Sequence, residues 1–414
     1  MSSISERSLY VGLHLPGASL PVPAGLMRVV RDGLSEEGVF AYGRGYLARP
    51  DAVSLNPAYL PLGPGVTTMP RRRLRDGGAL NQTFRDALPD AWGRLVLAAR
   101  NDWRELDDVD VLLATNADRV GAMTFAESPS LGAVDGPLER YALEDLAEAA
   151  HRLAFDMEVP REMRRLLRHG GSLGGVRPKA TLIRGDALWM AKFPARDDEL
   201  DVETLEACTM ALARRCGIRV PEFELVPLRS ARALVLRRFD RPGSIERDLR
   251  LHYLSAAAFT DSPYASSEGS YVRLARHLRL HGADVASDLR ELFRRLVFNL
   301  FIDNSDDHVK NHGVLHVAAD RFRLAPAFDL VPQLGNLGYQ GMAIVDGRPE
   351  SDLSLALDHS AEFGLSRHQA SDEIQHIRVG VGAWRSVFEA TGADAQIMRR
   401  VEHCFGQQAR LIGA

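Results

Sequence analysis

The residues most able to perform chemistry lie in one short acidic segment, Asp306-Asp307-His308-Val309-Lys310-Asn311. Phosphoryl transfer to a hydroxyl needs a carboxylate beside the incoming nucleophile and oxygen ligands for the magnesium that bridges the phosphates. Asp306 and Asn311 have the spacing of the kinase catalytic loop D-x-x-x-x-N. The segment therefore predicts Asp306 as the catalytic carboxylate and Asn311 as a metal ligand, with Lys310 neutralising charge on the transferred phosphoryl group.

A second acidic motif follows at the place where a kinase-type metal site requires one. Phe328-Asp329-Leu330 comes after a strand-like run, Phe322 to Leu324, so Asp329 takes the position of the DFG aspartate of protein kinases. We expect Asp329 to bind metal together with Asn311. A zinc hydrolase is an alternative, because His308 and His312 are four positions apart beside two aspartates. That alternative is weaker, since the Glu of an HExxH motif is missing.

Lysine is scarce in this chain, and its use points to phosphate. Of 51 Lys and Arg residues only three are lysine, and each lies in a motif suited to phosphate chemistry. Lys192 ends the strand-like segment LWMAK, and a predicted helix that begins near residue 202 and ends at Gly217 follows it. The apolar face of this helix is predicted to be core, and its members recur at helical spacing: Leu205, Cys208, Leu212 and Cys216. A strand lysine that grips ATP phosphates needs a carboxylate from a packed helix to hold it. Glu203 and Glu206 are both candidates, and periodicity alone does not choose between them.

The glycine-rich segment GGSLGGVRPKA, residues 170–180, is suited to bind phosphate through its backbone. Glycines allow main-chain N–H groups to approach phosphate oxygens without a Cβ in the way. The segment matches neither GxGxxG nor GxxxxGK[ST], so it indicates neither a Rossmann fold nor a P-loop. We expect Gly174, Gly175 and Lys179 to contact the nucleotide. Ser172, a hydroxyl in the middle of the segment, is a candidate for autophosphorylation.

Further nucleotide contacts are expected where the β-rich part ends. Arg238-Phe239-Asp240-Arg241 lies at the position of a kinase hinge, where main-chain groups meet adenine, so Arg238 and Phe239 are predicted to bind nucleotide. His308, two positions after Asp306, is included with them. An Arg–Asp pair that steadies the turn is a structural alternative for this motif, and both roles can hold together.

Composition limits the class of protein. The chain has 414 residues, a net charge of −4 and 45% hydrophobic residues, which suits two or three domains and argues against a general nucleic-acid coat protein. Its three cysteines lack metal-ligand spacing. The start of the chain lacks the pattern of a secretory signal, and no apolar run is long enough to span a bilayer. We therefore expect a cytoplasmic protein without membrane attachment.

The order of elements predicts an α+β fold. Short strands and turns alternate in residues 1–127, with a helix over Gln82 to Arg100. A second segment, 137–250, begins with a helical pattern to about residue 169 that is broken once at Pro160, and it continues with the glycine-rich segment, a hairpin and one helix. The third segment, 251–414, is mostly helical and contains the acidic motifs. This order is that of a bilobal protein kinase, with a β-rich N-terminal subdomain and small lobe and a mainly helical C-terminal lobe.

These motifs together resemble the HipA family of bacterial type II toxin–antitoxin kinases, whose core is similar to that of phosphoinositide 3-/4-kinases. The resemblance covers nearly the whole chain and rests on motifs in the order of the family: FRDALPDAWGR (84–94), VGAMTF (120–125), GGVRPKA (174–180), AKFP (191–194), RFDR (238–241), NSDDHVKN (304–311) and APAFDLVP (325–332). It implies Asp306 as the catalytic aspartate, Asn311 and Asp329 as Mg²⁺ ligands, and Lys192 as the ATP lysine paired with Glu206. The family's reactive serine lies in the glycine loop, but Gly174 stands just before Gly175-Val176 here, so Ser172 is a displaced candidate.

The resemblance also implies a biological role. Family members use ATP and Mg²⁺ to phosphorylate Ser or Thr of cellular proteins, including aminoacyl-tRNA synthetases, and so arrest growth and favour persistence. A HipB-type helix-turn-helix antitoxin holds them in check and binds operator DNA, so we expect this chain to meet DNA only through such a partner. Two alternatives stay open: a kinase for a small molecule or lipid headgroup, and a catalytically inert scaffold that partners a DNA-binding antitoxin.

Overall fold

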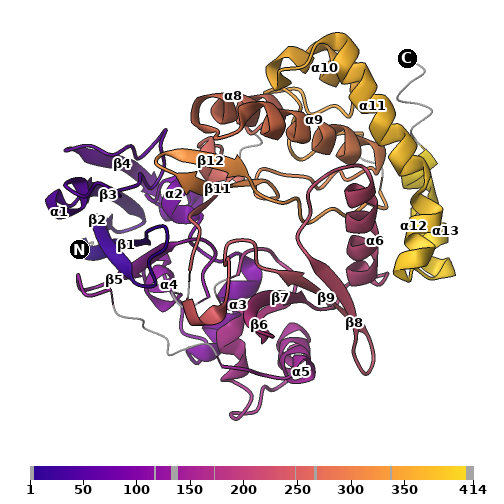
Figure 1. The fold of residues 1–414 in the computed structure, drawn as a ribbon. Coiled ribbons are helices and arrows are strands. Elements are labelled where there is room, and N and C mark those ends of the chain that lie inside the picture. Colours follow the sequence, from indigo (N-terminus) through magenta and orange to yellow (C-terminus); the bar gives the residue numbers. More distant parts are fainter. Residues whose placement is uncertain are drawn as a thin grey trace. The chain divides into compact units, whose positions relative to one another are not determined.

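The structure is a computed structural model, and it describes residues 4–115, 118–131, 139–171, 173–247, 249–264, 268–335 and 338–406. The chain divides into two compact units, each assembled from separate chain segments. Unit 1 contains Met1–Met190, Asp240–Leu254 and Leu315–Asp320, and unit 2 contains Ala191–Phe239, Ser255–Val314 and Arg321–Ala414. Figure 1 shows the fold, with most helices and strands of the two units labelled. The domain limits drawn from the sequence at 127, 137 and 250 stay predictions.

A five-stranded antiparallel sheet forms the first part of unit 1 (Figure 1). Alternating residues of its strands are buried, because successive side chains of a strand point to opposite faces. Leu9 lies opposite Met27, and Met27 lies opposite Phe40, so the three buried side chains form one row of the core. In sheet order the strands are β4 (Val66–Arg73), β3 (Ser35–Tyr42), β2 (Pro21–Asp32), β1 (Ile4–His14) and β5 (Met123–Ala126).

Most of β7 (Ala187–Lys192), β10 (Tyr253–Ser255) and β11 (Gly313–Ala318) belongs to unit 1, because the division of the chain cuts these three strands. Short helices and one whole further strand complete the described part of unit 1. They are α1 (Arg44–Leu47), η1 (Leu74–Asp76), α2 (Gln82–Arg85), α3 (Ala91–Arg100), α4 (Asp108–Ala114), α5 (Leu143–Ala154), η2 (Leu166–His169), β6 (Lys179–Arg184) and η3 (Ile245–Arg247). The single helix predicted over 82–100 is wrong. It is divided into α2 and α3, because Pro89 cannot donate a backbone hydrogen bond and Asp90 forms the N-cap of α3. The pattern after 137 also gives a shorter helix than predicted, since α5 ends at Ala154, before Pro160.

Unit 2 places a small β-rich part and a helical part around the acidic motifs. Strands β8 (Phe223–Pro227) and β9 (Arg232–Arg237) form a hairpin, and β9 lies between β8 and the end of β7 (Ala187–Lys192). Helix α6 (Val202–Arg215) packs on β9, and its predicted end at Gly217 agrees with the positive φ of that glycine. Cys208 and Cys216 are buried, as their spacing predicted.

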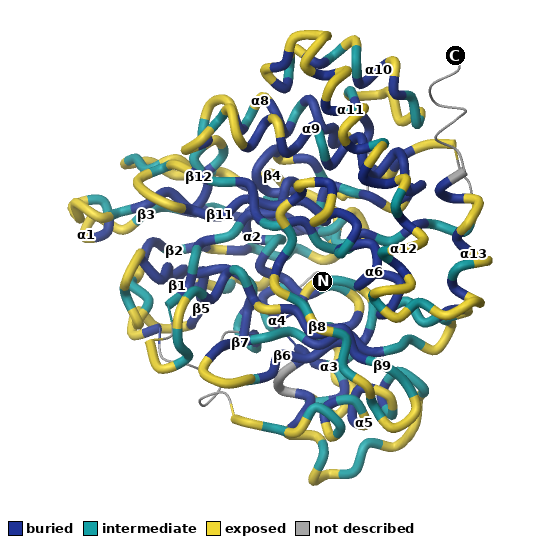
Figure 2. The backbone as a smooth tube through the Cα atoms, turned by 45° about the vertical axis from the view of Figure 1, so that its right-hand side comes forward, coloured by how far each residue is buried: buried dark blue, intermediate teal, exposed yellow. Residues whose placement is uncertain are grey.

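The helical part of unit 2 is built around α9 (Val285–Phe301), which packs against α8 (Tyr271–His281) and α11 (Arg367–Gly382) and is largely buried in Figure 2. Within the described ranges, none of the helices combines the length and apolar character needed to cross a membrane. The other elements of unit 2 are α7 (Ala256–Phe259), β12 (Arg321–Leu324), α10 (Leu353–Asp358), η5 (Ser360–Phe363), α12 (Trp384–Thr391) and α13 (Ala395–Gly406), together with the ends of β10 and β11 that lie outside unit 1.

Candidate active site

Lys192, the last residue of β7, places its ammonium between two carboxylates of unit 2. Its Nζ lies 2.8 Å from both Oε1 and Oε2 of Glu206, and it also contacts Oδ1 of Asp329. Burial by itself would lower the pKa of Lys192, but the charges of Asp329 and Glu206 outweigh burial and raise that pKa above its ordinary value. Lys192 is therefore a fixed cation, and pairing compensates the cost of burying its charge.

Glu206 is the carboxylate of α6 that contacts Lys192, which resolves the choice between Glu203 and Glu206. Asp201 caps α6 by accepting a hydrogen bond from Thr204 N at 2.9 Å, so the first turn of the helix is fixed. Oε1 of Glu206 also accepts a hydrogen bond from the backbone N of Asp329 at 3.1 Å. Burial raises the pKa of Glu206, and Lys192 opposes that rise. One carboxylate thus holds both the strand lysine and the main chain of Asp329.

Residues 303–312 are called here the acidic loop, and within its segment 306–310 more exposed side chains alternate with buried ones. Asp306 is exposed, and the side chains two and four positions later, His308 and Lys310, are half-buried. Asp307 and Val309 point inward and are buried. Amides at the start of α7 hold the loop, because Ala256 N donates to His312 O at 2.8 Å and Ala257 N donates to Val309 O at 3.2 Å. The predicted residues Asp306, His308 and Lys310 are therefore outward, whereas Asn311, also predicted for chemistry, is buried.

Asp306 and Asn311 lie together on the acidic loop. Nδ2 of Asn311 donates to the backbone carbonyl of Asp306 at 3.3 Å, and Asn311 N donates to His308 O at 2.8 Å, which closes a turn between them. The pKa of Asp306 is raised, first by partial burial and then by the negative charges of Asp329 and Asp307, while His308 opposes the rise. A carboxylate with a raised pKa is a better proton acceptor than an ordinary aspartate.

Asp329 has a left-handed backbone with φ of 54°, a conformation that aspartate tolerates better than most residues. The residues before it are anchored, since Ala325 N donates to Gly313 O at 2.8 Å and Ala327 N donates to Arg219 O at 2.7 Å. The ring of Phe328 stacks on Phe239, with centroids 5.9 Å apart. Phe239 therefore packs beside the predicted metal-binding motif, and Arg238 next to it is buried.

The oxygen groups of Asn311 and Asp329 fit magnesium better than zinc. Across the described ranges, no group of three or more His, Cys, Asp or Glu side chains gathers in a way that could hold a metal by itself. His312 is buried with its Nε2 2.8 Å from Asp307, and His308 accepts a hydrogen bond from Lys310 N at 3.3 Å through Nδ1. Mg²⁺ takes few protein ligands and completes its coordination with phosphate oxygens and waters.

Residues 170–179 are called here the glycine loop, and those of them that the structure describes lie in unit 1 against the start of α3. Gly175 N donates to Oδ2 of Asp90 at 2.6 Å, and the indole N–H of Trp92 donates to Lys179 O at 2.8 Å. Lys179 is buried, with Nζ 2.6 Å from Gly174 O. Gly175 has φ of 91°, a backbone conformation that residues with a Cβ rarely adopt, so this position favours glycine. Contact of these residues with nucleotide stays a prediction, and Ser172 lies outside the described residues.

The sequence did not single out Asp90 as a partner of the glycine loop. A signal was present, because an acidic residue that follows proline and precedes a helix is positioned to accept backbone N–H groups.

The second half of the RFDR motif also has a structural role within unit 1. Asp240 accepts a hydrogen bond from Gly121 N at 2.9 Å, and Arg241 bonds both Asp240 and Gly121 O.

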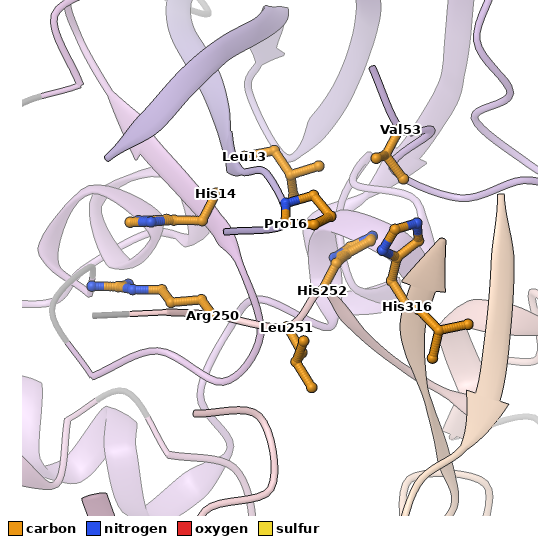
Figure 3. Close-up of a pocket in the computed structure, with 9 residues that line it drawn as sticks. Leu13, His14, Pro16, Val53, Arg250, Leu251, His252 and His316 are labelled. Atoms are coloured by element: carbon orange, nitrogen blue, oxygen red, sulfur yellow. The ribbon is translucent and has the colours of Figure 1, made fainter. Parts of the chain in front are cut away.

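A small cavity of unit 1 is separate from the predicted site residues (Figure 3). Its volume is about 30 Å³, which is the space of roughly one water molecule. His252 lines it, and burial lowers the pKa of that histidine to about 4, so the ring is neutral near pH 7. We assign no ligand to this cavity. Its lining residues are Leu13, His14, Pro16, Val53, Arg250, Leu251, His252, His316 and Val317.

Comparison with known proteins places the motifs in a family context. Residues 171–384 match the HipA-like C-terminal domain, and residues 24–126 match the HipA N-terminal domain. The chain is similar to HipA in a solved complex of HipA, HipB and operator DNA from Shewanella oneidensis MR-1, with a TM-score of 0.69 and 19% identity over 97% of this chain and 96% of that one. This likeness confirms the expected mixed α and β fold.

Two curated relatives carry the name of kinase. The chain is 26% identical to "Putative kinase Y4dM" of Sinorhizobium fredii over 322 residues, which is 74% of this chain and 76% of the relative. It is 24% identical to a "Putative kinase" of Haemophilus influenzae over 258 residues, which is 55% of this chain and 74% of that protein.

Proposed function

The chain belongs to the HipA family, and from that premise we propose that it is a kinase that transfers phosphate from ATP to Ser or Thr of a cellular protein. The observation that carries the proposal is the set of groups in unit 2. Lys192 is clamped by Glu206 and Asp329, and the acidic loop exposes Asp306 and holds Asn311 beside it, with its Nδ2 3.3 Å from the backbone carbonyl of Asp306. These are the residue types that phosphoryl transfer requires.

Each residue has a distinct task in the proposed reaction. Asp306 accepts the proton of the substrate hydroxyl, for which its raised pKa suits it. Lys192 binds phosphate oxygens of ATP, and Glu206 keeps its ammonium in place. Asn311 and Asp329 would hold Mg²⁺, which neutralises phosphate charge when bound. Lys310, half-buried on the outward side of the acidic loop, adds positive charge there.

The proposed cellular role is that of a toxin restrained by a HipB-type helix-turn-helix antitoxin, through which the pair would contact operator DNA. Support comes from the family membership and from the similar Shewanella protein, whose solved complex contains HipB and operator DNA. The proposed target is a cellular protein, of which an aminoacyl-tRNA synthetase is the candidate that the family resemblance offers.

Incubation of the purified chain with γ-labelled ATP, Mg²⁺ and a bacterial extract tests the activity. We expect label in a protein band, in phosphoserine or phosphothreonine after hydrolysis, and no transfer by Asp329→Ala. Label in a small metabolite or a lipid would instead identify a small-molecule kinase. Growth arrest that persists in both Asp306→Asn and Asp329→Ala would support an inert scaffold and contradict the proposal.

A further inference from the structure

Beneath the acidic loop of unit 2 lies a buried chain of polar side chains that the sequence did not indicate. Both carboxylate oxygens of Asp307 are bonded, Oδ2 to the phenol of Tyr271 and Oδ1 to Nε2 of His312 at 2.8 Å. Asp307, Tyr271 and His312 are 1%, 0% and 3% exposed. The ring of Tyr271 also meets His312 edge to face, with centroids 5.1 Å apart. A buried carboxylate is stable only when it is hydrogen-bonded in this manner.

The series of hydrogen-bonded side chains continues from Tyr271 toward the second acidic motif. Nδ2 of Asn299, near the end of α9, donates to the Tyr271 hydroxyl at 2.9 Å. Asn304 Nδ2 donates to Oδ1 of Asn299 at 3.2 Å and lies 3.5 Å from the backbone carbonyl of Asp329. Asn299 and Asn304 are each 1% exposed. One buried series of polar groups therefore joins the inner side of the acidic loop to the main chain of Asp329.

The position of Asp307 in the acidic loop links this buried series of polar groups to the residues predicted for chemistry. Asp307 directly follows Asp306, and His312 directly follows Asn311. Because each buried residue shares a peptide bond with its predicted site neighbour, hydrogen bonds that fix Asp307 and His312 also fix the backbone from which the side chains of Asp306 and Asn311 project. Apolar packing alone would bury the loop without fixing the orientation of its backbone, because such packing is not directional. Hydrogen bonds require particular directions and therefore fix that orientation.

We propose that Tyr271, Asp307 and His312 are positioning residues that set the geometry of Asp306 and Asn311 relative to Asp329. The proposal rests on the proposed function, since it concerns the same metal–nucleotide site. Residues that orient metal ligands by hydrogen bonds commonly change metal affinity or activity by about 10- to 100-fold when they are replaced. The substrate-facing side chains stay unchanged in such variants, so the effect belongs to orientation and not to lost contacts.

Tyr271→Phe and Asp307→Asn test the proposal with little change of volume. We expect kcat to fall about tenfold in Tyr271→Phe, while the KM for ATP stays within about twofold, because Lys192 and its clamp are unaltered. The affinity for Mn²⁺ in the presence of a non-hydrolysable ATP analogue, measured by electron paramagnetic resonance, should fall by a similar factor. Asp307→Asn should behave in the same direction.

Two control variants separate positioning from general destabilisation. Tyr141→Phe removes a phenol that bonds the Glu139 carboxylate at the surface of unit 1, so it makes the same chemical change outside the site. Ile377→Val weakens the core of unit 2 at a fully buried position of α11. Both should keep the parent kcat and Mn²⁺ affinity, and thermal melting should show that all variants are folded.

The outcomes distinguish this proposal from the proposed function. If the parent chain transfers no phosphate, the proposed function fails, but the Mn²⁺ affinities of the variants still decide whether the buried chain positions the metal ligands. If Tyr271→Phe and Asp307→Asn keep the parent kcat and Mn²⁺ affinity, the positioning role is overturned. That role is overturned as well if the two variants lower only the melting temperature, as Ile377→Val does.

Discussion

The acidic loop of unit 2 and the glycine loop of unit 1 are held in different ways. The acidic loop is fixed from inside by side chains, with Asp307 and His312 buried beneath Asp306 and Asn311. The glycine loop is fixed through its main chain, since Gly175 N donates to Asp90 and Gly174 O accepts from Lys179. The first arrangement orients outward side chains before any ligand binds. In the second, the Asp90 side chain accepts the Gly175 N–H, a backbone donor that the sequence predicts for phosphate.

The largest expected effect is on the outward side of the acidic loop. Asp306→Asn should lower kcat about a thousandfold, because the amide cannot accept the hydroxyl proton. Label transfer under single-turnover conditions measures the loss. Asp358→Asn, at an exposed carboxylate of unit 2 paired with Arg367, is the matched control and should keep full activity. If Asp306→Asn keeps its activity, the acidic loop does not supply the catalytic carboxylate, and the two loops differ only in how they are held.

The clamp on Lys192 should have the next largest effect, this time on stability. Glu206→Gln leaves a buried ammonium with a weaker partner, so the free energy of unfolding should fall by about 3 kcal/mol. Urea denaturation gives this value. Glu199→Gln makes the same change in an exposed pair with Arg400 and should cost less than about 1 kcal/mol. If both variants lose the same free energy of unfolding, the buried pair of Lys192 and Glu206 contributes no more to stability than the exposed pair.

Release of the glycine loop should have a smaller and more local effect. In Asp90→Ala the Gly175 amide loses its carboxylate acceptor, a hydrogen bond worth about 1.5 kcal/mol, so its hydrogen exchange should speed up about tenfold. Mass spectrometry of peptides from residues 173–179 detects the change. Asp102→Ala, at an exposed carboxylate, serves as control. Unchanged exchange in Asp90→Ala would show that the loop is held by packing alone.

The smallest expected effect concerns pH. The pKa of Asp306 is raised, so the acid limb of kcat/KM should lie at higher pH than for an ordinary aspartate, with activity lost as pH falls and Asp306 takes up its proton. The electrostatic influence of His308 lowers the pKa of Asp306, so His308→Gln should move the limb further toward neutral pH. A pH–rate profile of both proteins decides this. A limb that moves to lower pH in the variant would contradict the assignment of charges.

The elements with strong local patterns were predictable, and those set by distant contacts were not. The spacing of Leu205, Cys208 and Leu212 indicated α6 from the sequence, and glycine ended it. The choice between Glu203 and Glu206 could not follow from periodicity, because it depends on where the strand that carries Lys192 lies. The prediction of one helix over 82–100 was too long, because Pro89 separates α2 from α3.

The candidate site was predictable in its outward residues because their types match a known chemistry. The inward residues were missed for a physical reason. Asp307 looks like another solvated carboxylate in sequence, and its role depends on Tyr271, which is 36 positions earlier and reaches it only through the packing of α8. Asn299 and Asn304 carry no motif of their own. Such partners become visible only when the side chains that bury them are placed.

The scarcity of lysine has a practical consequence for labelling. Lys179 and Lys192 are buried at 5% and 4% exposure, whereas Lys310 is half-buried on the outward side of the acidic loop. An amine-directed reagent therefore meets few competing side chains on this protein, and the lysine amine most open to it stands on the same loop as Asp306. A fluorophore or crosslinker attached there would report on occupancy of the proposed site with little background from the rest of the surface.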